Sequence, residues 1–170
     1  MNWFLALAAF SVLGVIAVQN YLYPPLRNET ISSGLTGPYH WWLDASYLAL
    51  AAALVVSFTK SPLAEALAIV SAIALVLTAA TNTFWKFWDK ITGGNHSLWH
   101  SRFTIVVFTA ALLLQVVSDK GKWGWYTLAN TLLPGALYFI LKKFSKLSIS
   151  ASPAAEKLYT LGLSTWLMFH

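Results

Sequence analysis

The chain has 170 residues, of which 58% are hydrophobic and only 10% are charged, and its mean hydropathy is +0.61. A water-soluble domain usually carries about 25% charged residues, so this composition excludes an ordinary soluble protein and predicts an integral membrane protein. The net charge of +5 comes from Lys and Arg residues scattered between apolar runs, so we expect no nucleic-acid partner. The absence of cysteine excludes disulfides, thiolate metal sites and cysteine nucleophiles.

Six apolar segments approach or reach the length of about 20 residues that a membrane-crossing helix needs. In chain order they are residues 3–23, 41–59, 63–85, 99–117, 123–141 and 154–170. The first has aromatic residues at both ends and lacks the basic start of a cleaved signal peptide, which indicates a retained helix. The last is only just long enough to cross. The predicted fold class is therefore all-α: a polytopic transmembrane helical bundle of about six helices, with residues 1–170 forming a single transmembrane domain.

Local sequence signals mark two of the helix starts and one irregularity. The stretches SPLAE (61–65) and SPAAE (152–156) each place Ser at an N-cap, Pro at the first helical position and Glu in the first turn. They predict the starts of the third and sixth helices. Pro134 lies inside the fifth segment, where it removes a backbone hydrogen bond and predicts a bend.

The distribution of positive charge predicts an orientation. Eight of the 11 Lys and Arg residues fall in or beside the first, third and fifth loops, which a six-helix topology places on one side. The positive-inside rule puts that side in the cytoplasm and both termini outside. We therefore expect a multi-pass protein of the prokaryotic cell membrane.

One group of side chains has metal-ligand chemistry. His40 and Asp44 are four residues apart at the start of the second helix, and His96 and His100 are four apart near the start of the fourth. Residues i and i+4 share a helix face, and the predicted topology puts all four at one membrane depth. Three imidazoles and a carboxylate can bind Zn²⁺ and leave a position for an activated water. The alternative is that these groups mark the wet ends of helices and bond one another, lipid headgroups or backbone carbonyls.

The sequence gives weaker support to two other functions, serine-nucleophile catalysis and transport. Ser46, Ser97 and Ser101 lie close to the histidines, as a Ser–His–Asp nucleophile would require, but serine is common at helix ends. Transport is the other, and it normally uses broken helices or repeated halves. Only Pro134-Gly135 hints at a broken helix in this chain.

The whole chain resembles a family of six-helix membrane proteins through three stretches. They are RNETIS (27–32) with LTGP (35–38), TGG (92–94) before a helix led by His96 or His100, and EKLYTLG (156–162) with Trp166. The family is bacterial and archaeal, is classed as a domain of unknown function and is distantly similar to Frag/DRAM-like proteins. Its loop reads R-x-x-I-S-x-L-G, and this chain has extra residues there. The resemblance implies six helices and no assigned active site.

Two other likenesses imply metal chemistry. The His-x-x-x-His pair with a nearby Asp is similar to membrane hydrolases of the alkaline-ceramidase type, which have seven helices. The stretches HWWL (40–43) and NTFWKFW (82–88) resemble the C subunit of copper membrane monooxygenases. That subunit has a ligand histidine where this chain has Lys86, so its copper site would be incomplete here.

No strong catalytic motif is present, which favours a non-enzymatic role. We predict a small polytopic membrane protein that binds lipid or is an accessory subunit of a larger membrane complex. Its partners would then be membrane lipids and other membrane protein subunits. The alternative is a metal-dependent membrane enzyme, a hydrolase or an oxidoreductase, which holds a divalent metal such as zinc at the cytoplasmic interface through His40, Asp44, His96 and His100.

Overall fold

The protein is an all-α helical bundle. A computed structural model describes residues 2–23, 40–118, 124–143 and 151–169, and within these ranges it contains seven helices and no strand. The helices are α1 (Trp3–Leu22), α2 (His40–Ser57), α3 (Pro62–Thr83), α4 (Trp85–Thr92), α5 (His96–Ser118), α6 (Gly124–Lys143) and α7 (Ala151–Phe169). Six of them have 18 to 23 residues and correspond to the six predicted segments.

The helix starts agree only in part with the local signals. α3 begins as predicted, with Ser61 at its N-cap, Pro62 as its first residue and Glu65 in its first turn, but the Ser61 side chain makes no capping hydrogen bond. α7 begins at Ala151, so the prediction of an N-cap at Ser152 is wrong. Pro134 lies inside α6 as predicted.

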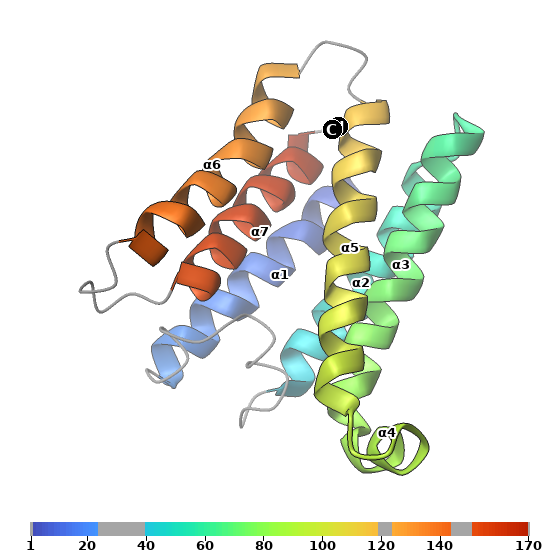
Figure 1. Ribbon diagram of the computed structural model, residues 1–170. Helices are drawn as coiled ribbons and strands as arrows, with labels where there is room; N and C mark the ends of the chain where they lie inside the picture. Colours follow the sequence, from blue (N-terminus) through green and yellow to red (C-terminus); the bar gives the residue numbers. More distant parts are fainter. Residues whose placement is uncertain (1, 24–39, 119–123, 144–150, 170) are drawn as a thin grey trace.

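Among the described helices, α4 is the one that the sequence does not predict, because the apolar pattern of the third segment continues through residue 85 and the residues after it resemble a loop. Phe84 leaves the helical conformation, with φ −109° and ψ 38°, and ends α3 before the chain enters α4. Gly93 and Gly94 then adopt positive φ angles of 64° and 86°, a conformation that glycine reaches without steric cost. In Figure 1, α4 lies across the ends of α3 and α5.

The six long helices form a ring that is tightly packed along most of its circumference. α3 packs extensively on α5 and on α2, α2 packs on α1, α1 on α7, and α7 on α6. The ring closes between α5 and the α6–α7 pair, where contact is slight. Figure 1 shows this division, with α6, α7 and α1 on one side and α2, α3 and α5 on the other.

Small residues account for the close approach of the packed helices. Ala9, Ala53 and Ala68 are completely buried in the core, beside larger side chains such as Leu5 and Leu114. An alanine at a helix contact lets two backbones come near each other, as in other membrane bundles. The outer faces of the helices, by contrast, expose many large apolar side chains, which suits contact with lipid.

Three described helices are long and apolar enough to cross a membrane by length and composition: α1, residues Pro62–Thr81 of α3, and α5. The sequence predicts six spans, but α2, α6 and α7 do not meet the same standard of length and composition. α7 carries the charged pair Glu156-Lys157, whereas α6 is made less apolar by residues such as Asn130 and Pro134.

The two ends of the bundle differ in chemistry. At one end, the Asn2 amide donates to the Ser57 hydroxyl over 2.8 Å, and the Phe58 and Trp166 rings stack with centroids 6.0 Å apart. Because these residues come from the start of α1 and the ends of α2 and α7, both described chain ends lie there. The opposite end carries the starts of α2 and α5, and with them all four predicted metal ligands.

Candidate functional site

His40 and Asp44 form a small cluster with α3 at this second end. The Asp44 Oδ2 atom lies 3.2 Å from His40 Nδ1 and accepts a hydrogen bond from the Thr83 hydroxyl at 2.7 Å. The other carboxylate oxygen, Oδ1, is buried and has no hydrogen-bond partner among the described residues. The cluster therefore ties the start of α2 to the end of α3.

His96 belongs to a different contact, between α4 and α5. Its Nδ1 atom lies 2.7 Å from Asp89 Oδ1, and the same oxygen accepts a hydrogen bond from the His96 backbone N–H at 3.3 Å. Asp89 thus bonds one of the unpaired N–H groups at the start of α5, where the helix dipole favours a negative charge. The Trp85 ring, 6.1 Å from the imidazole, packs against the same histidine.

His100 is the buried histidine, with only 7% of its surface exposed. Its Nδ1 atom lies 3.1 Å from the Thr78 carbonyl oxygen and 3.1 Å from the Thr81 hydroxyl, both on α3. A carbonyl oxygen can only accept, so Nδ1 carries the ring proton. The neutral imidazole then presents a lone pair on Nε2, which is buried and has no partner in the described part of the chain.

The four predicted ligands therefore lie at one end of the bundle but in three separate surroundings. Within the described ranges, no group of three or more His, Asp or Glu side chains is placed to hold a metal ion. Metal binding by His40, Asp44, His96 and His100 stays a prediction. The geometry shows instead that each of the three histidines is engaged by a different neighbour.

A groove lies where the ring of helices is least tightly closed, between α5, α6 and α7. Its volume is about 450 Å³. It is lined by His100, Ser101, Thr104, Ile105, Phe108, Pro134, Gly135, Tyr138, Ala155, Glu156 and Tyr159. We call this surface the lateral groove. It lies on the side of the bundle and combines polar groups with an apolar wall.

The lateral groove is bounded by contacts that cross it. The Tyr159 hydroxyl donates to the Phe108 carbonyl oxygen over 2.9 Å, and the two rings pack edge to face 4.9 Å apart, which joins α7 to α5. Nearer the terminal end of the bundle, the Asn130 amide donates to Gln115 Oε1 at 3.3 Å and joins α6 to α5. The gap between the helices is therefore limited to the end that carries His100.

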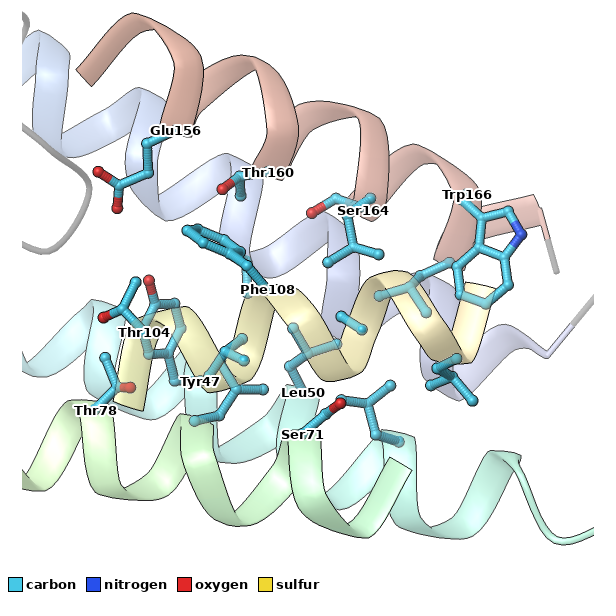
Figure 2. A pocket seen from close by; sticks show the side chains of 18 residues that line it. Tyr47, Leu50, Ser71, Thr78, Thr104, Phe108, Glu156, Thr160, Ser164 and Trp166 are labelled. Atoms are coloured by element: carbon cyan, nitrogen blue, oxygen red, sulfur yellow. The ribbon is translucent and has the colours of Figure 1, made fainter. Parts of the chain in front are cut away.

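A smaller cavity of about 50 Å³ lies inside the ring and shares Thr104, Phe108 and Glu156 with the lateral groove. A buried water needs about 10–15 Å³ of such space, so the cavity has room for only a few waters or a narrow apolar group. Figure 2 shows Glu156 at one end of the cavity and Trp166 at the other. The inner cavity extends the lateral groove into the core.

The sequence predicts that Glu156 lies at a helix start but does not predict its place in the lateral groove. A signal was present in the spacing, because Glu156, Tyr159, Thr160 and Ser164 recur at intervals of three and four along α7. Such intervals place side chains on one helix face. A polar stripe on an otherwise apolar helix indicates a face turned toward other polar groups, and here it lines the lateral groove and the inner cavity.

Comparison of the chain with known protein families, with characterised proteins and with solved structures finds no match. The resemblance to the six-helix family therefore stays a prediction, and its first stretch, residues 27–38, lies outside the described residues.

Proposed function

We propose that the protein is a small polytopic membrane protein that binds a lipid in the lateral groove. The observation that carries this proposal is the position of the groove, on the side of a bundle whose outer faces expose apolar side chains. A ligand would reach such a groove from the lipid phase. Its volume of about 450 Å³ lies within the range of known small-molecule sites, about 300–1,000 Å³.

The groove has the two-part character that an amphiphile requires. Polar residues such as Ser101, Glu156 and Tyr138 line it together with the apolar residues Ile105 and Phe108. The inner cavity continues from the groove into the core. An amphiphile could place its polar group beside these polar residues and its chain along the outer surface of α5.

The membrane setting of the proposal follows the predicted topology. All six long helices would cross the bilayer, both termini would lie outside the cytoplasm, and α4 would lie at the cytoplasmic surface of the prokaryotic cell membrane. A role as accessory subunit of a larger membrane complex fits the same exposed apolar faces, and lipid in the groove would then lie between subunits.

A blocked groove tests lipid binding. We expect wild-type protein, purified in mild detergent, to retain lipid that native mass spectrometry detects, and a Gly135→Trp variant to lose it. The indole would occupy the groove, since nothing lies within 4 Å of a Cβ atom at Gly135. Gly14→Trp on α1 is the matched control, because a Cβ atom there also meets nothing within 4 Å. Equal lipid retention in both variants, or none in the wild type, would contradict the proposal.

A metal-dependent membrane enzyme is a second candidate function, because the ring proton of His100 lies on Nδ1 and leaves the Nε2 lone pair for a metal ion. Metal-binding histidines commonly donate their second ring N–H to a backbone carbonyl, as His100 does to Thr78. Glu156 lines the same groove and has a carboxylate. Zinc in stoichiometric amount in the purified protein, lost in His100→Ala and retained in His96→Ala, would support this candidate. Substoichiometric metal in gently purified wild type would exclude it.

A further inference from the structure

The short helix α4 is held in place by contacts with α5. The Trp85 ring lies 6.1 Å from the His96 imidazole, and the Trp88 ring packs edge to face against Phe103 at 5.9 Å. Asp89 bonds the backbone and the ring of His96. These contacts fix one side of α4 against the start of α5, so its other sides form an outer surface of defined shape.

This outer surface has an apolar edge. Phe84, just before the helix, and Phe87 and Ile91 within it expose 62%, 61% and 57% of their surfaces. Their spacing of three and four residues places them along one side of the helix. Three large apolar side chains that are exposed together mark a surface that contacts an apolar phase.

Two lysines flank the apolar edge. Lys86 and Lys90 are exposed and lie four residues apart, so they share a face of α4. With about 3.6 residues per helical turn, that face lies beside the face of Phe87 and Ile91. A basic face next to an apolar face is typical of a helix that lies in the plane of a membrane interface.

Arg102 adds a third positive charge from the start of α5. It is exposed, and its guanidinium carbon lies 4.9 Å from the centre of the Trp99 ring. The Phe103 ring, which contacts Trp88 of α4, also lies 5.8 Å from the Trp99 ring. A row of aromatic rings therefore connects Arg102 to α4.

The positive charge of this surface is not neutralised within the described part of the chain. The ion pairs found there do not include Lys86, Lys90 or Arg102. Asp89 is the one carboxylate in the sequence of α4, and its Oδ1 atom bonds His96. An anion outside the protein can therefore contact three cations beside an apolar edge.

We propose that α4 and the start of α5 bind the headgroups of anionic phospholipids at the membrane surface. The phosphates contact the two lysines and Arg102, and the apolar edge enters the boundary of the acyl chains. Anionic lipids attract Lys and Arg near the bilayer surface. The apolar edge favours a lipid over a nucleic acid or an acidic soluble protein, which would leave these side chains in water. The surface is separate from the lateral groove, so the inference goes beyond the proposed function.

Two phospholipids with the same acyl chains test the choice of headgroup. The intact protein is titrated in mild detergent with dioleoylphosphatidylglycerol or dioleoylphosphatidylcholine, and native mass spectrometry gives each affinity. We expect the wild type to bind the anionic lipid about tenfold more tightly, a difference of about 1.4 kcal/mol. The variant Lys86→Gln/Lys90→Gln should lower this preference to about twofold. Equal affinities in the wild type overturn the inference.

Two control variants locate the preference in the molecule. Lys142→Gln/Lys143→Gln removes the same charge from the end of α6, and Gly135→Trp blocks the lateral groove. Both should keep the preference for the anionic lipid. If the α6 variant loses as much of it as the α4 variant, the total charge decides binding and the inference is wrong. If Gly135→Trp alone loses it, the anionic lipid binds in the lateral groove, which overturns the inference and leaves lipid binding intact.

Single cysteines test whether the apolar edge contacts acyl chains, because the chain has no cysteine of its own. In nanodiscs that contain the anionic lipid, Phe87→Cys should react more slowly with a charged maleimide than Lys86→Cys on the neighbouring basic face. Both positions are exposed in the protein alone, so a difference reports burial in lipid. Equal reaction rates would show that α4 lies in water and would overturn the inference.

Discussion

The two sides of α5 differ sharply, and the difference shows how one bundle combines rigidity with a binding surface. Toward α3, the helix makes the most extensive contact in the molecule. Toward α6 and α7 it makes little contact, and the lateral groove fills the space. His100 belongs to both sides, because its Nδ1 atom is fixed by α3 while the residue lines the groove. The packed side thus fixes a buried histidine that also borders the open side.

Larger side chains should have the most different effects on the two sides of α5. Thr81 is completely buried and its hydroxyl bonds His100, so Thr81→Leu overfills the α3–α5 contact and removes a hydrogen bond. We expect a loss of about 3 kcal/mol in the free energy of unfolding, measured by thermal denaturation in detergent.

The matched substitution on the open side is Gly135→Leu. A side chain there meets nothing within 4 Å, and replacing glycine in a helix gains up to about 1 kcal/mol. We expect unchanged or increased stability together with loss of bound lipid. If Thr81→Leu and Gly135→Leu lower the free energy of unfolding equally, the groove is closed in the detergent-solubilised protein.

A glycine at the α6–α7 contact should give the next largest effect. A Cβ atom at Gly162 would overlap the buried Asn130 amide, which bonds Gln115. Gly162→Ala should therefore cost about 1 kcal/mol, because the loss of that bond outweighs the gain in helix propensity. Gly14→Ala, where the space is open, should be neutral or stabilising. A stabilising Gly162→Ala in the same thermal assay would show that α6 and α7 are not in close contact there.

The smallest expected effect concerns the tether between α7 and α5. Tyr159→Phe removes the hydrogen bond to the Phe108 carbonyl and should lower the free energy of unfolding by about 1 kcal/mol. Tyr138→Phe is the comparison, since Tyr138 is half-buried and lines the same groove. Hydrogen exchange at the α5 amides around Phe108 should rise in the Tyr159 variant alone. No difference between the two variants would indicate that the tether contributes nothing.

Most of the helical framework could be predicted from the sequence. Apolar length alone located six long helices, and Pro62 marked the start of α3 correctly. The number of spans was less secure, because α7 includes Glu156-Lys157 and α6 includes less apolar residues such as Asn130 and Pro134. α4 could not be predicted because α3 ends where Phe84 departs from helical geometry. No glycine or proline in this stretch indicates such a break.

The candidate site was harder to predict, because it depends on which neighbour each side chain meets. His96 and His100 are one helical turn apart and were assigned to a common site, yet one contacts Asp89 on α4 and the other contacts Thr78 and Thr81 on α3. Spacing along one helix indicates a shared face but does not identify the neighbour. Glu156 joined the groove through the packing of α7, which the sequence alone does not specify.

α4 has a consequence for how the protein responds to its bilayer. Phe84, Phe87 and Ile91 form an exposed apolar edge, while Lys86 and Lys90 supply positive charge, a pattern that lies flat in the interfacial plane. In the proposed membrane setting, such a helix would fix the insertion depth of the bundle, and so the height of the lateral groove relative to the headgroups. In a thicker bilayer the long helices would have to reduce their tilt or thin the membrane around them. Occupancy of the groove would then depend on membrane thickness as well as on the concentration of the ligand.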